Sequence, residues 1–279
     1  MKIAIQGIKG SYHHKVAKEF FNNEIEIIEC LSFDDLVNKI ANEKCDYGIM
    51  AIENSIAGSI IPNYSLIDNS DLHINGEYYI NINHNLMVYP GVDFDSINNI
   101  SSHPMALLQC KDFLKKANKI IVEDLDTAQV AKKIRDNKLI DTAAIAGLEA
   151  AEIYGLEIIK TNIQTIKDNE TRFVVVSKNS EKTTIKELNK ASLKFILSHK
   201  NGSLANILGI MADYELNLTK IQSIPIIETP WKYSFFIDTT FTNFNKYKEA
   251  IKKVSLESEM VKEFGVYKNF KSLWILQKD

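Results

Sequence analysis

The residues most able to do chemistry in this sequence are small polar side chains that follow predicted strands. They form four groups, each at the end of an apolar run and before a predicted helix: Gly10 with Ser11, Asn54 with Ser55, Ser101 and Ser102 with His103 and Pro104, and Asp126 with Thr127. In open α/β sheets a ligand binds beyond the carboxyl ends of the strands, where helix N-termini offer unpaired N–H groups to an anion. Any single group is more often a helix cap or a turn. The four groups together predict a cleft for a small organic acid.

A fifth group stands at the beginning of a predicted strand. Residues 167–173 form a turn that leads into this strand, so Thr171 and Arg172 occupy its first positions and point to opposite faces. A threonine hydroxyl can donate a hydrogen bond to a departing oxygen, and a guanidinium can pair with a carboxylate through two parallel bonds. Thr-Arg-Phe is also an ordinary beginning for a strand, so periodicity alone does not single it out.

The sequence carries no motif for a nucleotide, a metal or a redox pair. The glycine loop that begins at Gly7 is not GxGxxG and is not followed by Gly-Lys-Ser/Thr, and the histidines show no HExxH spacing. The three cysteines lack a CxxC pair, so we expect reduced, buried thiols. We expect His13 and His14 on an early helix turn with one of them solvated, and His103 as a capping or packing residue.

Length and composition place the chain among ordinary soluble proteins. It has 279 residues, 45% of them hydrophobic and 25% charged, which predicts two domains that each bury a core. The net charge of −3 gives no global positive field, so neither nucleic acid nor a membrane surface is an expected partner. The apolar run at residues 3–5 is too short for a signal peptide, and no run approaches the ~20 residues that span a bilayer. We expect a cytoplasmic protein.

Up to about residue 178 the pattern alternates short β-rich runs with helical stretches, which predicts an α/β domain with a largely parallel sheet. Ser32 is the expected N-cap of a helix that contains Phe33 and Ile40, and Pro104 and Asp126 are expected to begin further helices. The expected strands cover residues 1–6, 25–29, 47–52, 86–88, 119–122, 142–146 and 172–176. The polar residues 177–190 indicate a linker, which we place at 181–190.

A second domain is predicted over residues 191–279. Its expected strands are 193–198, 218–227, 233–240 and 261–266, its expected helices are 203–212 and 244–254, and a turn is expected at Thr229 and Pro230. A βαββαβ order in about 80 residues is typical of a ferredoxin-like domain.

Four motifs, in this order along nearly the whole chain, resemble the prephenate dehydratase family with a C-terminal ACT regulatory domain. They are Gly7-Ile8-Lys9-Gly10-Ser11-Tyr12, Ile52-Glu53-Asn54-Ser55 with Gly58, Ser102-His103-Pro104 with Gln109-Cys110, and Asn169-Glu170-Thr171-Arg172-Phe173. The resemblance implies a catalytic domain over residues 1–180 that is similar to a type 2 periplasmic binding protein, with the active site between two lobes. One lobe would take residues 1–78 and 163–180 and the other residues 79–162, whereas the pattern itself shows only one α/β region.

The same resemblance implies an enzyme of L-phenylalanine biosynthesis, a lyase that turns prephenate into phenylpyruvate, CO2 and water without a cofactor or a metal. It implies that Thr171 donates a hydrogen bond to the departing hydroxyl, because a bare hydroxide is a poor leaving group. The other implied catalytic residues are Asn54, Ser102 and Gln109, and the implied substrate-binding residues are Ser11, Ser55, Arg172 and Phe173. Ile8, Ala51 and Met105 stand where proline, proline and glutamine are usual in the family.

For the second domain the resemblance implies an effector site for L-phenylalanine, which would inhibit the enzyme. The implied effector residues are Asn201, Gly202, Ser203, Leu204, Gln222 and Ser223. Gln222 and Ile224 replace a usual Glu and Arg, so both members of an opposite-charge pair are absent together and no charge is left unpaired. Because an ACT effector site normally lies between two such domains, the resemblance also implies a homodimer or a homotetramer.

Three other interpretations stay open at this point. Arogenate dehydratase would perform the same chemistry on an aminated side chain. A non-catalytic sensor of amino acids or organic acids would use the same binding fold without turnover. The second domain could also be a packing module that binds no ligand.

Overall fold

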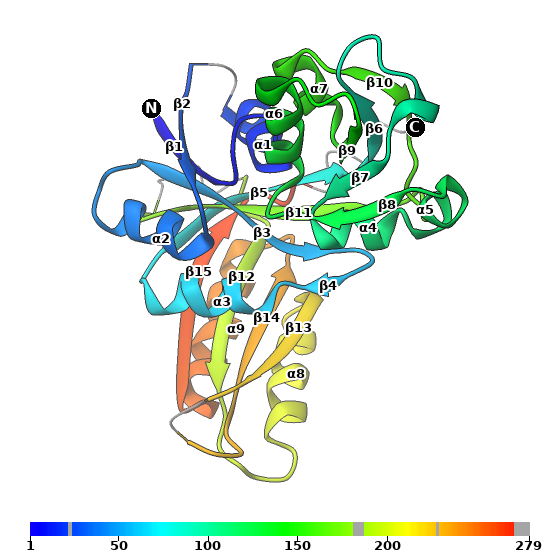
Figure 1. Cartoon of the computed structure of the whole chain (residues 1–279). Helices are drawn as coiled ribbons and strands as arrows, with labels where there is room; N and C mark the ends of the chain where they lie inside the picture. The colour runs from blue at the N-terminus through cyan, green and yellow to red at the C-terminus, as the bar shows by residue number, and fades with distance from the viewer. Residues whose placement is uncertain (22–23, 181–186, 227–228, 271–279) are drawn as a thin grey trace. The chain divides into compact units, whose positions relative to one another are not determined.

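The first sheet along the chain has six strands (Figure 1). In the computed structural model, which describes residues 1–21, 24–180, 187–226 and 229–270, these are β1 (Lys2–Gln6), β2 (Glu26–Cys30), β3 (Tyr47–Asn54), β4 (Gly58–Ser59), β5 (His73–Asn81) and β11 (Glu170–Ser177). Their order is β2-β1-β3-β11-β5, with β4 paired to β3. β1 is parallel to β2 and β3, and its residues Ile3, Ala4 and Ile5 are completely buried. A strand that is apolar on both faces is typical of a parallel sheet covered on both sides.

Helices α1 (Tyr12–Phe21) and α2 (Phe33–Ala41) pack on β1 and β3. The predicted cap of α2 is confirmed, because the Ser32 hydroxyl oxygen accepts a hydrogen bond from the Asp35 N–H at 3.1 Å. Leu36, Val37 and Ile40 lie on one face of α2 and are buried. The local pattern therefore fixes both the beginning of this helix and the face that joins the core.

The prediction that His13 or His14 is solvated is wrong. The His13 ring lies edge-on to Phe33 and Phe173, with centroids 5.5 and 5.0 Å away, and burial lowers its pKa from 6.5 to about 3. His14 is buried, and its Nδ1 accepts a hydrogen bond from the Gly10 N–H at 3.1 Å. Both imidazoles face the protein because the helix side that carries them packs against neighbouring elements.

A second, separate sheet has the order β10-β6-β9-β7-β8. Its strands are β6 (Asn85–Val88), β7 (Asn99–Ser102), β8 (Ile120–Glu123), β9 (Thr142–Ala146) and β10 (Glu157–Lys160). β7 is parallel to β8 and β9, whereas β6 is antiparallel to β9 and β10. The residue pattern indicates one α/β region with one sheet, so the second sheet corrects that interpretation. β5, β7 and β10 are absent from the predicted strands.

Two apolar clusters cover the two faces of this second sheet. Leu86 and Val88 belong to one cluster, and Met87 between them belongs to the other. The helices of this region are α4 (Pro104–Gln109), α5 (Lys111–Ala117), α6 (Thr127–Asn137) and α7 (Leu148–Tyr154), with a 3₁₀ turn η1 (Phe94–Ser96). The predicted caps are confirmed: His103 Nδ1 accepts from the Met105 N–H at 3.2 Å, and Asp126 caps α6.

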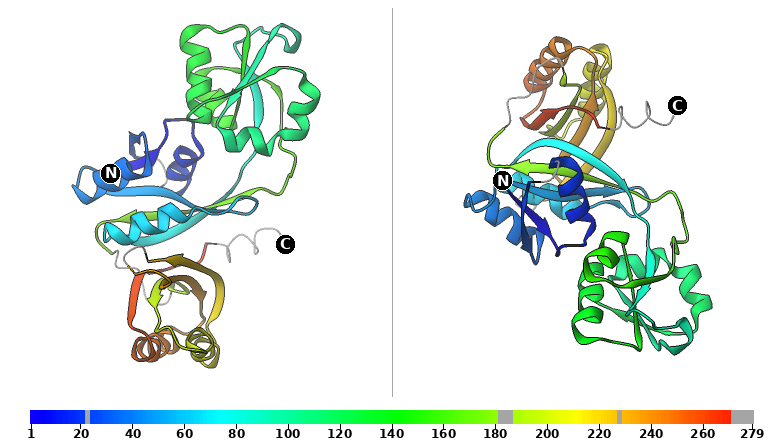
Figure 2. Two further views of the ribbon diagram at one scale, coloured as in Figure 1. Left: turned by 60° about the horizontal axis from the view of Figure 1, so that its bottom comes forward. Right: turned by 90° about the horizontal axis from the view of Figure 1, so that it is seen from above.

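A third sheet is antiparallel and has the order β13-β14-β12-β15. Its strands are β12 (Lys190–Ile196), β13 (Asn217–Pro225), β14 (Tyr233–Thr240) and β15 (Met260–Tyr267). Helices α8 (Ser203–Asp213) and α9 (Phe244–Glu257) lie together on one face (Figure 2). The predicted βαββαβ order is thus present, with the strand order of a ferredoxin-like fold. Residues 227–228, at the end of one predicted strand, lie outside the described residues.

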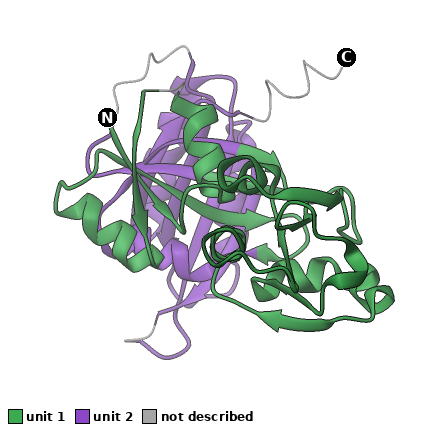
Figure 3. Cartoon of the chain, turned by 45° about the horizontal axis from the view of Figure 1, so that its top comes forward, with its two compact units in different colours: residues 1–58, 79–173 green, residues 59–78, 174–279 purple. Residues whose placement is uncertain are grey.

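Contacts along the chain divide it into two compact units (Figure 3). One unit holds Met1–Gly58 and Tyr79–Phe173, and the other holds Ser59–Tyr78, which includes α3 (Ile61–Asn69), and Val174–Asp279. β4, β5 and β11 each pass from one unit into the other. The predicted domain and lobe boundaries stay predictions, and residues 181–186 of the predicted linker and 271–279 of the predicted second domain lie outside the described residues. Within the described ranges, no helix is long and apolar enough to cross a membrane.

The three cysteines, Cys30, Cys45 and Cys110, are free and buried, as predicted. Burial raises the pKa of the Cys110 thiol to about 12 and that of Cys30 to about 11. Thiols held in the neutral form are poor nucleophiles, which favours a packing role for these side chains.

Candidate active site

Asn54, the last residue of β3, connects a turn to the beginning of β11. Its buried Nδ2 donates to Thr171 Oγ1 at 2.9 Å and to Asn169 Oδ1 at 2.7 Å. Its Oδ1 accepts from the N–H groups of Ile56 at 3.0 Å and Ala57 at 2.8 Å. The side chain therefore closes the turn between β3 and β4, and the expectation that a helix begins directly after Asn54 is wrong.

Ser55 strengthens the same connection. Its N–H donates to the Glu170 carbonyl at 2.8 Å, and its hydroxyl oxygen accepts from the Glu170 N–H at 2.9 Å. The structure thus brings Asn54, Ser55 and Thr171 together, although they lie more than one hundred residues apart along the chain.

The Thr171 hydroxyl has one proton that is not engaged. Its oxygen accepts from Asn54, and the described residues offer no acceptor for its own proton. The residue is only 7% exposed, so solvent does not compete freely for this proton. Because Asn54 occupies one side of the oxygen, the proton is directed away from Asn54. The arrangement presents an oriented hydroxyl donor.

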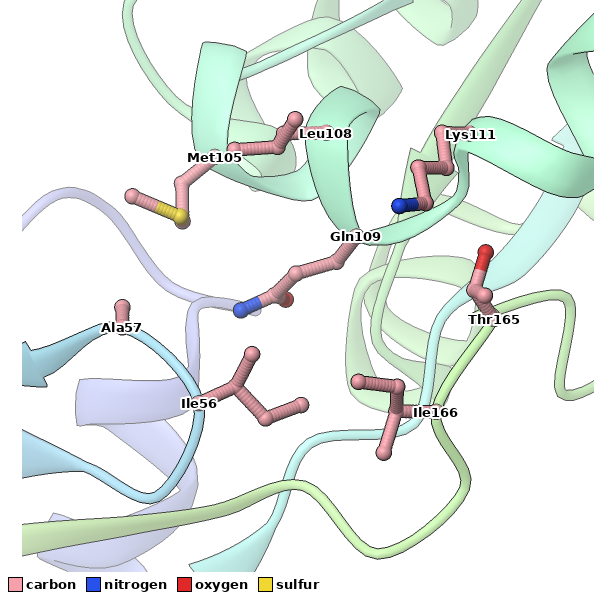
Figure 4. Close-up of a pocket in the computed structure, with 8 residues that line it drawn as sticks. All are labelled: Ile56, Ala57, Met105, Leu108, Gln109, Lys111, Thr165 and Ile166. Carbon is pink, nitrogen blue, oxygen red and sulfur yellow. The ribbon is translucent and has the colours of Figure 1, made fainter.

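A cavity of about 440 Å³ lies beside the turn that Asn54 closes (Figure 4). Its walls are mostly apolar, with polar groups on α4 and the segments near it, and its lining residues are Ile56, Ala57, Met105, Leu108, Gln109, Lys111, Thr165 and Ile166. Figure 4 shows the side chains of Gln109 and Lys111 extending between these walls. The cavity can hold a small apolar ring together with a negatively charged group at Lys111.

The Gln109 amide is held by a buried histidine. Gln109 Oε1 lies 2.8 Å from His84 Nε2, and His84 Nδ1 lies 3.2 Å from the Tyr12 hydroxyl. Burial lowers the pKa of His84, so the neutral ring carries one N–H, which Nε2 must hold to donate to Gln109 Oε1. This tautomer leaves the amide N–H2 of Gln109 free for the cavity. Neither His84 nor Lys111 was predicted, because neither has a local sequence signal.

The glycine loop before α1 packs against α6 and α7 of the second sheet. Gly7 and Gly10 have φ of +90° and +93°, a region that favours glycine. A Cβ on Gly7 would lie 2.9 Å from Asp126 Oδ2, and one on Gly10 would lie 3.1 Å from Ala150 Cα. The glycines of this motif therefore allow the loop backbone to lie close to the neighbouring elements.

Two of the predicted site residues are serines whose side chains are buried in the protein. Ser102 is completely buried, and its hydroxyl donates to the Ile145 carbonyl at 2.6 Å. Ser11 is also buried, and its Oγ accepts from the His14 N–H at 3.3 Å at the beginning of α1. Neither serine lines the cavity next to Asn54.

Arg172 and Phe173 follow Thr171 on β11 and are both buried. The Phe173 ring packs on His13, so it belongs to the apolar core under α1. Of the eight residues predicted for the catalytic domain, Gln109 alone lines the described cavity, and Asn54 and Ser55 adjoin its wall at Ile56.

The predicted effector residues lie on two elements of the C-terminal sheet. Asn201 and Gly202 form the turn before α8, where Gly202 has φ of +83°, and Ser203 and Leu204 begin the helix. Gln222 and Ser223 lie on the edge strand β13, whose residues alternate between exposed and half-buried.

Comparison with known proteins assigns the chain to a family. Residues 3–181 match the family model described as prephenate dehydratase. A bifunctional chorismate mutase/prephenate dehydratase of Buchnera aphidicola subsp. Acyrthosiphon pisum is 31% identical over 94% of this chain and 69% of its own length. Arogenate dehydratase/prephenate dehydratase 2 of Arabidopsis thaliana, described as chloroplastic, is 34% identical over 85% of this chain and 65% of its own length. The chain thus spans about two thirds of these relatives.

Solved structures share the fold. A protein described as GqqA, a novel type of quorum quenching acylase, superimposes with a TM-score of 0.87 at 25% identity, covering 96% of this chain and 98% of that one. Prephenate dehydratase from Arthrobacter aurescens in complex with L-Phe gives a TM-score of 0.85 at 24% identity over 96% of this chain and 90% of that one.

The curated relatives define an enzyme of the dehydratase class, a carbon–oxygen lyase, and the solved structures share the mixed α/β fold. Within that class the motifs and the matched residues agree on one family. The chain belongs to the prephenate dehydratase family.

Proposed function

We propose that this protein converts prephenate into phenylpyruvate, CO2 and water. The observation that carries the proposal is the hydroxyl of Thr171, whose oxygen is held by Asn54 while its proton stays available. Family membership supports the reaction class, and the geometry of the Thr171 hydroxyl supports a donor role toward the group that must leave.

The reaction breaks two bonds. The bond from the ring to the ring carboxylate breaks, its electron pair moves into the ring, and the C–O bond on the opposite side breaks. The ring becomes aromatic, CO2 leaves, and the departing oxygen becomes water with a proton that solvent finally supplies. Aromatisation drives the reaction, so the protein has to stabilise the negative charge that grows on the departing oxygen.

Thr171 is proposed to stabilise the negative charge on the departing oxygen. Its hydroxyl donates a hydrogen bond to the departing oxygen in the transition state and stays a threonine throughout, since its own acidity is too low for it to titrate. Asn54 is proposed as its partner, because an amide donor on one side of the oxygen directs the proton to the other side.

The cavity is proposed to hold the substrate ring. Ile56, Ala57 and Ile166 offer apolar contact, and the low polarity favours loss of the ring carboxylate as neutral CO2. Gln109 and Lys111 are proposed to bind a substrate carboxylate. Because the chain carries a net charge of −3, binding of a dianion depends on such local groups.

The C-terminal unit is proposed to contain an ACT domain that binds L-phenylalanine at Asn201, Gly202, Ser203, Leu204, Gln222 and Ser223. Its βαββαβ order supports this proposal, and so does the complex of the Arthrobacter aurescens prephenate dehydratase with L-Phe. A homodimer or homotetramer and a cytoplasmic location belong to the same proposal. L-phenylalanine up to millimolar concentration should lower activity or shift the melting temperature, and the effector assignment fails if it changes neither.

Arogenate dehydratase is the second candidate function. An arogenate dehydratase of Petunia hybrida is 34% identical over 93% of this chain, which supports it as strongly as the identity of the other relatives supports prephenate. The two substrates differ in the side chain and share the departing groups, so the proposed role of Thr171 holds for both.

The test uses the purified full chain with prephenate, with arogenate and with an acylated quorum-sensing signal. Phenylpyruvate is followed by its absorbance in alkali, phenylalanine by chromatography, and the acylase reaction by release of the free acid. The proposal predicts turnover of prephenate with the largest kcat/KM. A larger kcat/KM for arogenate selects the second candidate. Ligand-dependent thermal shifts without any turnover would indicate a sensor and overturn both.

A further inference from the structure

Strand β8 forms an edge of the second sheet, and its surface is apolar. In the sheet order it lies at one end, paired only with β7 (Figure 1). Ile120, Ile121 and Val122 are 64%, 41% and 40% exposed, and Leu125 just beyond the strand is 80% exposed. Edge strands are normally protected by inward charges, proline or a bulge. β8 has an unbroken register with β7 and no charge among its first three residues.

The backbone of β8 offers hydrogen-bonding groups at the open edge. The N–H groups of Ile120 and Asp124 donate to carbonyls on the β7 side, each at 2.9 Å. Because successive residues of a strand alternate in direction, the N–H and C=O groups of Lys119, Ile121 and Glu123 point the other way. These groups are spaced as an antiparallel neighbour requires.

We propose that β8 pairs antiparallel with β8 of a second copy of this chain, about a two-fold axis at Ile121. In this register Lys119, Ile121 and Glu123 of one copy lie opposite the same three residues of the other copy. Their outward N–H and C=O groups can therefore form hydrogen bonds between the two strands. Lys119 lies opposite Glu123 of the partner subunit at both ends, and Ile120 lies opposite the partner's Val122. The pairing therefore joins opposite charges at its ends and apolar side chains at its centre.

The charges at the two ends suit this register better than another one. The Lys119 ammonium bonds to the carbonyls of Asp95 at 3.3 Å and Ile97 at 2.7 Å and lies 5.1 Å from the centre of the Phe94 ring, so these contacts hold the charge near the beginning of the strand. A register centred on Val122 would place Ile121 opposite a glutamate. The register at Ile121 pairs Lys119 with Glu123 at both ends.

A two-fold pairing closes on itself, since the same strand serves both copies. It would join the second sheets of two chains into one continuous sheet and remove both exposed edges. This interface lies within the N-terminal unit, so it does not depend on the proposed effector site or on the proposed activity.

The test measures the mass of the purified full chain by light scattering and sedimentation over a range of concentrations. Ile121→Lys places two positive charges against each other on the axis and should halve the mass. Ile140→Lys is the matched control, since Ile140 is as exposed as Ile120, at 64%, and lies outside β8, so it should leave the mass unchanged. Melting temperatures show whether each variant is folded.

A charge exchange tests the register itself. Lys119→Glu and Glu123→Lys each place like charges opposite one another and should raise the dissociation constant. The double exchange restores opposite pairs and should return the constant to within about threefold of the wild type. A monomeric wild type, an unchanged mass for Ile121→Lys, or a double variant weaker than both single variants would overturn the proposal.

Discussion

Asn54→Asp separates the two tasks of the Asn54 side chain. Aspartate keeps an oxygen that can accept from the N–H groups of Ile56 and Ala57, so the turn stays closed. It removes the N–H2 that donates to Thr171 Oγ1 at 2.9 Å and to Asn169 Oδ1 at 2.7 Å. The new carboxylate is an acceptor, so the Thr171 proton turns toward it and is lost to the substrate.

The expected losses follow from these bonds. A positioned proton donor contributes about 10²–10⁴-fold to rate, so kcat should fall by that factor, or about 2.7–5.4 kcal/mol of barrier. Each buried acceptor left unpaired costs about 1–3 kcal/mol of folding free energy. A protonated carboxyl can again donate one bond, so part of the rate should return as the pH falls.

The assay follows phenylpyruvate at saturating prephenate from pH 5 to 8, with melting temperature as a check on folding. Asn75→Asp is the matched control, because Asn75 Nδ2 also donates to a hydroxyl, that of Ser177, at 2.6 Å. The control should keep kcat within about twofold of the wild type. A folded Asn54→Asp enzyme with wild-type kcat would show that the Asn54 bond does not orient the Thr171 proton.

Three further predictions concern buried titratable groups. His84→Phe removes the donor that holds the Gln109 amide, so kcat/KM should fall about tenfold while the melting temperature changes little; an unchanged kcat/KM would refute the positioning role. The pKa of His13 is about 3 in the folded protein and about 6.5 in the unfolded chain, so between these pH values only the unfolded chain takes up a proton. The free energy of unfolding, measured in urea, should therefore be full above pH 6.5 and about 2 kcal/mol lower at pH 5. The His13→Leu variant should not show this loss. Lys190→Met removes the ammonium that lies 2.7 Å from the carboxylate of the fully buried Glu77 and should cost about 3–5 kcal/mol in denaturant unfolding, whereas a loss below about 1 kcal/mol would contradict this.

The elements that the sequence predicts well are those with local signals. The Ser32 cap lies next to the helix it begins, and the strand over residues 233–240 matches β14 residue for residue. The βαββαβ order of the C-terminal sheet follows from alternation and turns that lie within a few residues of one another.

Long-range pairing explains what the sequence did not predict. β3 and β11 are neighbours in the sheet although more than one hundred residues separate them, and β5 adds a strand whose sequence, HINGEYYIN, carries polar residues within it. Local periodicity therefore shows strands and helices in alternation, and it does not show that they divide into two sheets.

The candidate site divides in the same way. Asn54 and Thr171 stand out by their places at a strand end and a strand beginning, and the resemblance to family motifs gives them roles, whereas the hydrogen bond between them is a tertiary feature that no spacing predicts. Ser102 is polar and follows a strand, yet its hydroxyl bonds the Ile145 carbonyl within the sheet. The role of His84 is apparent only from the structure, in which its ring lies beside the Gln109 amide.

The most direct test of the central claim compares Thr171→Val with Thr171→Ser in single-turnover formation of phenylpyruvate from prephenate. Valine keeps the shape of threonine and removes the hydroxyl, whereas serine keeps the hydroxyl that Asn54 orients. The account predicts a rate about 10²–10⁴-fold lower for Thr171→Val and a rate within about tenfold of the wild type for Thr171→Ser. Equal rates for Thr171→Val and the wild type would contradict it.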